Sequence, residues 1–156
     1  MNKDYLCIFT PSFRLDEWNQ AILLFKGNRQ GPWKWFLGSH LNHVVVWVNS
    51  TKLPDLWVKL EVTPTGVTIK LSQVAMPPVD KFKWETKIVL ESTAFPERRP
   101  YHLYWCMGCH NVVAHLLGLR VGWSLTPKQF LKKLFKPKRR SEFRIVEVEE
   151  RYVGIN

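Results

Sequence analysis

The sequence predicts an α+β domain, in which a small antiparallel sheet packs against helices. Apolar segments of strand length, rich in β-branched and aromatic residues, are separated by short turn signals. Other segments repeat apolar residues at helical spacing and carry helix-capping residues. The chain has 156 residues, of which 46% are hydrophobic, enough for one domain with its own core. We therefore expect residues 1–156 to form a single domain.

The clearest strand signal is a hairpin. Residues 56–62 and 67–71 flank the turn residues 64–66. Residues 43–48 form a strongly β-type run, and residues 143–153 alternate apolar with charged side chains, which is typical of a half-exposed strand at the C-terminal end. Two further segments have a strand-like composition, residues 5–9 and 84–91.

Helices are expected in three places. Residues 16–25 begin with two acidic residues and place large apolar side chains on one helical face. Residues 109–117 have an apolar face and are followed by Gly118, a residue typical of helix C-caps. A shorter helix is expected over residues 126–134, with Thr126 as its N-cap and a proline in its first position.

Charge and composition indicate which partners and which cellular compartment to expect. The formal net charge of +10 favours an acidic partner such as nucleic acid, anionic lipid or an anionic cell-wall polymer. The N-terminal residues lack the apolar core of a secretory signal, and no apolar run approaches the length of a membrane span. Three cysteines, an odd number, are typical of free thiols in a reducing compartment. We expect a cytoplasmic protein with no transmembrane segment.

The segment around Cys109 carries the strongest chemical signal. It places a thiol at the start of the expected helix 109–117, where the positive end of the helix dipole favours the thiolate. A thiolate nucleophile needs an imidazole that takes its proton and later protonates the leaving group. His43 opens the β-type run 43–48 and can face the helix from the mouth of that strand. We expect Cys109 and His43 to form a catalytic pair, with His40 as the competing histidine.

Three motifs accompany this pair in a fixed order. They are a segment ending in GSHLNHV (residues 38–44), the segment WVKLEVTPTGV (residues 57–67), and the cysteine segment followed by LTPKQF (residues 125–130). In this order they resemble the circularly permuted branch of the NlpC-type papain-like cysteine hydrolases. The ending is similar to that of bacteriophage-encoded members, and the resemblance covers residues 18–134.

The resemblance implies a permuted papain-like fold and a thiol hydrolase that cleaves an amide or ester bond. Cys109 would be the nucleophile, His43 the general base, and Glu61 the third member that orients the imidazole. The implied substrates are peptides, peptidoglycan peptides or acyl lipids, with no cofactor and no metal. The backbone N–H of Cys109 is the expected oxyanion donor, and the second donor stays open between His102 and Tyr104.

The same cysteine region admits two other interpretations. Cys106, Cys109 and His110 form the C-x-x-C-H string of covalent haem attachment, but haem attachment occurs on exported proteins and this chain has no export signal. With His102 or His115 these residues could also supply zinc ligands, although structural zinc usually draws on two separated ligand pairs. His110 departs from the family pattern, in which a small or apolar residue follows the cysteine. We expect neither haem nor zinc.

A non-enzymatic interpretation rests on the basic segment 128–140, where aromatic residues accompany the positive charges. Such a segment could hold a phosphate backbone, as in a phage virion or assembly protein that keeps the papain-like fold, binds a polyanion and contacts phage structural proteins. A solvated helix face is the simpler explanation of a run of charges. The residues concerned are Lys128, Lys132, Lys133, Lys136, Lys138, Arg139 and Arg140.

Overall fold

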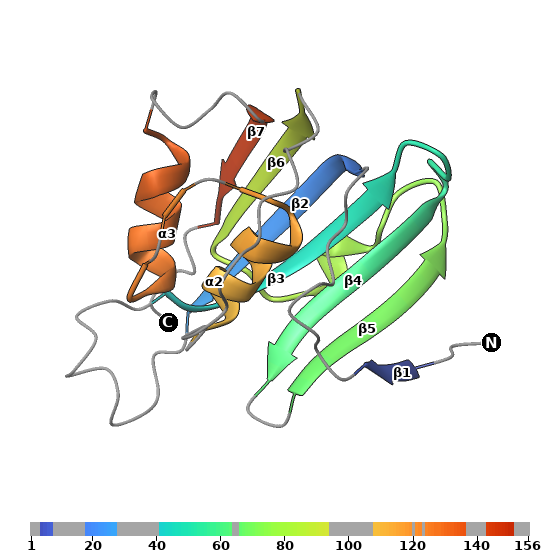
Figure 1. The fold of residues 1–156 in the computed structure, drawn as a ribbon, viewed down its shortest axis with the longest axis horizontal. Helices are drawn as coiled ribbons and strands as arrows, with labels where there is room; N and C mark the ends of the chain where they lie inside the picture. Colours follow the sequence, from blue (N-terminus) through green and yellow to red (C-terminus); the bar gives the residue numbers. More distant parts are fainter. Residues whose placement is uncertain are drawn as a thin grey trace.

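The protein is built on one antiparallel sheet that carries two helices on one face (Figure 1). The computed structural model describes residues 4–7, 18–27, 41–63, 66–93, 108–119, 121–122, 124–136 and 143–151. The strands are β1 (Asp4–Cys7), β2 (Trp18–Gly27), β3 (Leu41–Ser50), β4 (Leu56–Thr63), β5 (Gly66–Gln73), β6 (Thr86–Ser92) and β7 (Phe143–Glu150). They form a seven-stranded sheet in the order β1-β5-β4-β3-β2-β6-β7. With the helices α2 (Cys109–Leu116) and α3 (Pro127–Leu134), the sheet confirms the α+β class.

The expectation of a helix over residues 16–25 was wrong, because residues 18–27 form β2 in the interior of the sheet. This strand pairs with β3 on one side and with β6 on the other. Its alternate side chains enter two separate buried clusters, with Ala21, Leu23 and Phe25 on one face and Ile22 and Leu24 on the other. A strand buried on both faces is apolar at nearly every position, and helical spacing can be read into such a run as well.

The other expected elements are present within the described residues. The predicted hairpin corresponds to β4 and β5, whose register pairs Thr63 with Gly66. The β-type run at residues 43–48 lies within β3, and the C-terminal alternating segment gives β7, which pairs with β6. Residues 8–9 and 152–153 of the expected terminal strands lie outside the described residues.

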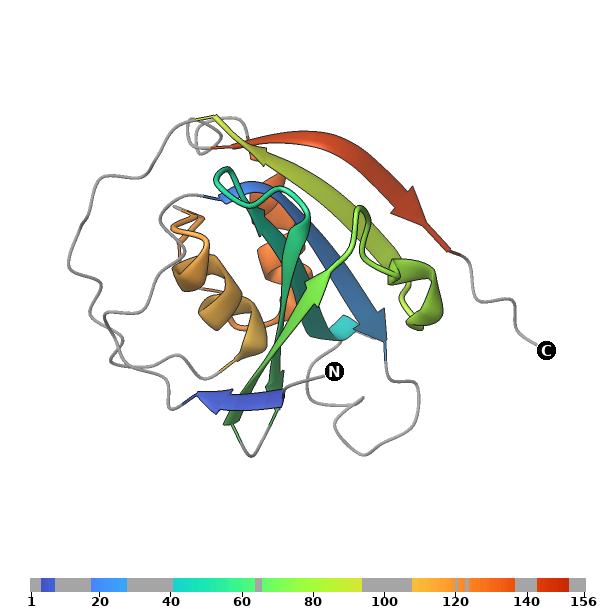
Figure 2. The ribbon, with the colours of Figure 1, turned by 90° about the vertical axis from the view of Figure 1, so that its right-hand side faces the viewer.

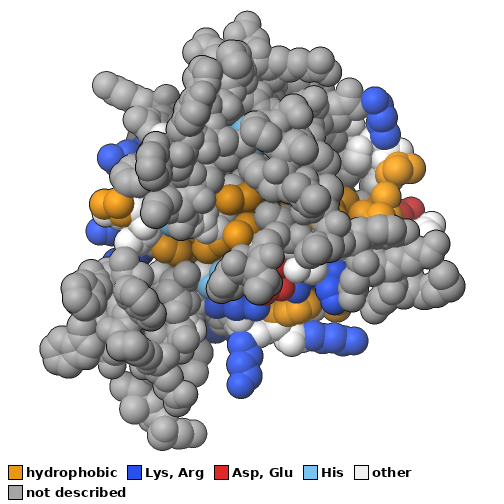
Figure 3. Space-filling view, turned by 60° about the horizontal axis from the view of Figure 1, so that its bottom comes forward, with side chains coloured by type: hydrophobic (Ala, Val, Ile, Leu, Met, Phe, Trp, Pro, Cys, Tyr) orange, Lys and Arg blue, Asp and Glu red, His pale blue; other side chains and the backbone are white. Residues whose placement is uncertain are grey.

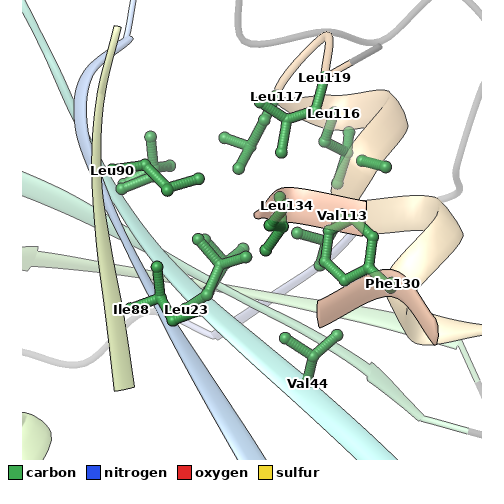
Figure 4. Close-up of a cluster of buried hydrophobic side chains, with 14 of the residues drawn as sticks. Leu23, Val44, Ile88, Leu90, Val113, Leu116, Leu117, Leu119, Phe130 and Leu134 are labelled. Atoms are coloured by element: carbon green, nitrogen blue, oxygen red, sulfur yellow. The ribbon is translucent and has the colours of Figure 1, made fainter. Parts of the chain in front are cut away.

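The main core lies between the sheet and the two helices (Figure 4). Leu23, Val44 and Ile88 contribute to it from three adjacent strands, and each has 0% of its surface exposed. From the helix layer come Val113, Leu116, Leu117, Leu119, Phe130 and Leu134. This packing fixes the position of α2 over the sheet and therefore the position of the first residue of α2.

The opposite face of the sheet is covered by the short helical turn η1 (Val79–Lys81) and the residues around it (Figure 2). Trp47, Trp57 and Trp84 are buried there in a second, smaller cluster, with Phe82 packed against it. Long cationic side chains lie over these rings: the Arg151 guanidinium carbon is 3.8 Å from the Trp84 ring centroid. Such contacts combine cation–π attraction with cover for the apolar surface.

The capping residues that the sequence predicts lie at the end of α2 and at the start of α3. Gly118 has a positive φ of 65° and follows α2; its N–H donates to the His115 carbonyl, and the N–H of Leu119 donates to the Ala114 carbonyl. These two bonds form a Schellman cap, for which glycine is favoured. The side chain of Thr126 accepts a hydrogen bond from the N–H of Gln129 at the start of α3. Neither described helix is long and apolar enough to cross a membrane.

The core position of β2 gives a first prediction. Leu23→Ala removes a side chain that is fully buried between the sheet and the helices, and it should reduce the free energy of unfolding by about 2–5 kcal/mol. Urea denaturation followed by tryptophan fluorescence measures this. The control is Leu71→Ala on β5, because Leu71 is 45% exposed. Equal effects of the two substitutions would contradict the placement of β2.

Candidate catalytic site

The three residues expected to act together are brought to one end of the sheet by three different elements. Cys109 is the first residue of α2, His43 lies near the start of β3, and Glu61 lies near the end of β4. The antiparallel register pairs Val45 with Glu61, which places Glu61 diagonally next to His43 on the same face of the sheet. Figure 3 views this side of the molecule, where histidine, basic and acidic side chains come close together.

The thiol of Cys109 lies among hydrogen-bonding groups from two elements. The groups that favour its thiolate form are the side chains of His43 and His110 and the backbone N–H of Val44. The residue before it, Gly108, is the N-cap of α2 and has extended backbone angles. Because the first N–H groups of a helix point outward from its N-terminus, the sulfur also lies at the positive end of the helix dipole.

The ring of His43 lies between the thiol and a carboxylate. Its Nε2 is 3.3 Å from Oε1 of Glu61, and the thiol of Cys109 also forms a hydrogen bond with the ring. About a quarter of the His43 side chain is exposed, since its relative accessibility is 26%. The ring is therefore held by two partners and still reaches the surface.

Two lysines that the sequence analysis did not single out bind the same carboxylate. Nζ of Lys59 is 2.6 Å from Oε2 of Glu61, and Nζ of Lys26 is 3.7 Å from Oε1. Both ammonium groups also lie over the ring of Phe82, at 4.6 Å for Lys59 and 5.7 Å for Lys26. The signal available in the sequence was the i, i+2 spacing of Lys59 and Glu61, which places both on one face of a strand.

Electrostatics favour an ion pair between the thiol and the imidazole. Burial by itself raises the pKa of Cys109, but the hydrogen bonds from His110, His43 and the Val44 N–H outweigh this and bring the pKa to about 6. The hydrogen bonds to Cys109 and Glu61 raise the pKa of His43 to about 9, against the opposing effect of burial. The hydrogen bond from His43, with help from Lys59, holds the pKa of Glu61 well below its usual range.

A buried polar network fixes the N-terminus of α2. The carbonyl of Ser124 accepts hydrogen bonds from Nε2 of His110 at 2.7 Å and from Nδ2 of Asn111 at 2.9 Å. The Oδ1 of Asn111 accepts in return from the N–H of Ser124 at 3.1 Å. All three residues are at least 92% buried, with exposures of 3%, 8% and 1%. Buried networks of this kind are costly to break, so they hold Cys109 in a defined place.

Several other candidate residues lie outside the described residues. They are His40, His102, Tyr104 and Cys106, so the competing histidine, both candidates for the second oxyanion donor and the first cysteine of the C-x-x-C-H string are not placed. His110 itself is placed, and its Nε2 donates a hydrogen bond to the backbone carbonyl of Ser124 in the core. Within the described part of the chain, no group of three or more His, Cys, Asp or Glu side chains is arranged to hold a metal ion.

The basic segment is described only up to Lys136. Phe130 and Leu134 of α3 are buried in the core, whereas Lys132 and Lys136 are exposed. Lys132 therefore lies on the outer side of an amphipathic helix, and Lys136 is exposed just after its end. Lys138, Arg139 and Arg140 lie outside the described residues.

Comparison with known proteins adds no relative: no protein-family model, no curated protein and no solved structure matches this chain.

The His43–Glu61 contact gives a second prediction. Glu61→Gln removes the negative charge beside Nε2 and should lower the pKa of His43, because the carboxylate stabilises the imidazolium. Titration of the ring C–H signals by NMR measures the pKa. The matched control is Glu91→Gln, since that carboxylate binds Arg144 on β7 and has no contact with His43. A His43 pKa that is unchanged by Glu61→Gln would contradict the described contact.

Proposed function

We propose that the protein is a cysteine hydrolase that cleaves an amide or ester bond through an acyl-thioester intermediate. The observation that carries the proposal is the position of the His43 ring, which interacts with the thiol of Cys109 and with the carboxylate of Glu61. The three residues come from positions far apart in the chain. Their convergence in the order nucleophile, imidazole and acid is the arrangement that acyl transfer requires.

In the first step the thiolate of Cys109 attacks the carbonyl carbon of the substrate. The new S–C bond forms as the carbonyl π electrons move to oxygen, and the backbone N–H of Cys109 at the start of α2 donates to that oxyanion. When the tetrahedral intermediate collapses, the bond to the leaving group breaks. The proton held by the His43 imidazolium passes to the departing nitrogen or oxygen, which leaves a thioester and a neutral imidazole.

In the second step the neutral imidazole of His43 takes a proton from water. The hydroxide equivalent attacks the thioester carbon, and the C–S bond breaks to release a carboxylic acid and to regenerate the thiolate–imidazolium pair. Since Nε2 of His43 faces Glu61, Nδ1 is the nitrogen left for these proton transfers. Glu61 keeps the imidazole oriented and stabilises its charged form in both steps.

The fold proposal follows from the same order of elements. A histidine at the mouth of one strand, an acid on the next strand and a cysteine that opens a later helix match the order of motifs in the permuted NlpC-type papain-like hydrolases. The sheet and the two helices are compatible with that architecture. We propose membership of this group, with peptide, peptidoglycan or acyl-lipid substrates, as the interpretation that explains all three motifs.

A second candidate function is binding of a polyanion by α3. The observation that favours it is the exposure of Lys132 on a helix whose apolar side is buried, and of Lys136 just after that helix, in a chain of net charge +10. Contacts of this kind neutralise phosphates without reading a base sequence, and they weaken as salt is added. The two functions use different parts of the molecule and are compatible.

The chemistry gives a third prediction, on acyl transfer. With p-nitrophenyl acetate as a generic ester, Cys109 should form an acetyl thioester that intact-protein mass spectrometry detects, with release of p-nitrophenol. His43→Ala should slow this acylation by ~100-fold or more, in line with the usual contribution of general acid–base catalysis. Cys109→Ala should abolish it, whereas the double substitution Cys7→Ala and Cys106→Ala should leave it intact. Acylation that survives Cys109→Ala at the same rate would refute the assignment.

The fourth prediction concerns pH. The thiolate forms as the pH rises through about 6, and the imidazolium is lost as the pH rises through about 9. Alkylation of Cys109 by iodoacetamide needs the thiolate alone and should rise once, near pH 6. Cleavage of an activated anilide also needs the imidazolium proton, so its rate should be bell-shaped between these limits. Alkylation that rises only near the ordinary thiol pKa of about 8.5 would contradict an activated nucleophile.

A further inference from the structure

Lys59 is a buried lysine beside the proposed catalytic residues, and it takes no part in the reaction steps. Only 7% of it is exposed, and no other Lys, Arg, Asp or Glu in the described part of the chain is buried. It lies on β4 two residues before Glu61, so both side chains point to the same face of the sheet. A charge buried at this position requires an explanation.

The stability of the fold does not account for a lysine here. Removing an ammonium group from water costs free energy unless a protein group replaces the water. A buried ion pair then adds little stability over apolar side chains of the same volume. Lys59 lies opposite Trp47 in the register of β3 and β4, and over the ring of Phe82, surroundings that suit an apolar residue. The charge is therefore expected to serve the group that it binds.

The group that Lys59 binds is the Glu61 carboxylate, and its contact is the shortest one to that carboxylate within the described residues. Nζ of Lys59 is 2.6 Å from Oε2 of Glu61. On the other oxygen, Oε1, Nε2 of His43 is at 3.3 Å and Nζ of Lys26 is at 3.7 Å. Because a carboxylate is planar and rigid, a short bond at Oε2 determines where Oε1 points. Lys59 is thus placed to aim Oε1 at the imidazole.

The ammonium group of Lys59 is itself held in place. It lies 4.6 Å from the centroid of the Phe82 ring, and this ring packs against Trp47 at 6.0 Å between centroids. Lys26 is held less closely: its side chain is 27% exposed, against 8% for Lys59, and its ammonium group is 5.7 Å from the same ring. Of the two lysines, Lys59 therefore has the fixed position from which the carboxylate can be oriented.

We propose that Lys59 is a positioning residue of the site, which orients the Glu61 carboxylate so that Oε1 faces Nε2 of His43. This proposal rests on the proposed cysteine hydrolase function and extends the three catalytic residues by one residue behind the acid. Lys59 acts on the imidazole through Glu61, by fixing the direction of its carboxylate. The line of interacting groups then runs from the thiol of Cys109 through His43 and Glu61 to a buried ammonium group.

The charge of Lys59 and its hydrogen bond have opposite effects on His43. A positive charge near an imidazolium disfavours it, so the loss of a mere neighbouring charge would raise the pKa of His43. The bond to Glu61 raises the pKa of His43, so the loss of a residue that holds this carboxylate in place would lower it. The sign of the change separates the two roles. Other charged groups nearby, Lys70 opposite Lys59 on β5 and Glu85 against the end of β2, stay the same throughout.

Three lysines of the chain allow a matched test. Lys59→Met keeps an unbranched apolar stem and removes the ammonium group. Lys26→Met removes a positive charge from the same carboxylate but leaves the bond at Oε2 intact. Lys87→Met on β6 is the structural control, because Lys87 is also enclosed, with 14% of its side chain exposed, and binds Glu147 at 2.6 Å over the ring of Trp84. Circular dichroism and urea unfolding show whether each variant is folded.

The first readout is the pKa of His43, measured by NMR titration of its ring C–H signals, which needs no catalytic activity. If the proposal is correct, Lys59→Met lowers this pKa by about one unit, Lys26→Met does not lower it, and Lys87→Met leaves it unchanged. In Glu61→Gln, adding Lys59→Met no longer lowers it, because the carboxylate through which Lys59 acts is gone. The second readout is acetylation of Cys109 by p-nitrophenyl acetate. Lys59→Met slows it about tenfold, since one pKa unit weakens the thiolate–imidazolium pair by that factor.

The outcomes that overturn this proposal differ from those that overturn the hydrolase proposal. A folded Lys59→Met in which the pKa of His43 rises or stays unchanged overturns the positioning role, even where His43→Ala slows acetylation. Acetylation that neither Cys109→Ala nor His43→Ala changes overturns the hydrolase proposal. If Lys59→Met does not fold, ¹⁵N relaxation of the lysine ammonium groups in the wild-type protein decides. A rigid Lys59 ammonium group that becomes mobile in Glu61→Gln supports the positioning role, and one as mobile as that of the exposed Lys81 overturns it.

Discussion

The carboxylate of Glu61 is the group on which the charge arrangement of this site depends. It binds one imidazole and two ammonium groups at once, from β3, β4 and β2. Because it stays ionised, it keeps a positive charge favourable on His43, and that charge in turn favours the thiolate of Cys109. Lys59 and Lys26 add two further positive charges beside Glu61, so His43 is one of three positive partners. Both lysine ammonium groups also lie over the ring of Phe82. Phe82 packs against the aromatic cluster on the sheet face opposite the helices, so the charged groups contact that cluster.

The nucleophile depends on a different set of contacts. The Schellman cap after α2 and the buried bonds between His110, Asn111 and Ser124 fix the two ends of this short helix. An isolated helix of eight residues would be unstable in water, so its position is set by packing on β3 and by these polar links. The same network buries the imidazole of His110, the residue that follows the nucleophile.

The sequence predicted those features that depend on a residue's own backbone or on its nearest neighbours in the chain. Thr126 and Gly118 predicted helix ends, the residues 64–66 predicted a hairpin turn, and Cys109 at a helix start predicted a thiol in a positive field. The β2 segment was misread because its apolar run satisfies two spacings. Only the presence of neighbouring strands on both sides and of packed layers on both faces distinguishes a central strand from a helix.

The sequence by itself therefore determined the α+β class, most of the element types and the three residues Cys109, His43 and Glu61 as candidates. The tertiary structure decided which side chains meet. Lys26 reaches Glu61 only because β2 lies beside β3, and His110 turns into the core only because Ser124 presents its carbonyl there. These contacts join segments that are not neighbours in the sequence, so they depend on how those segments pack together, which a local sequence pattern does not specify.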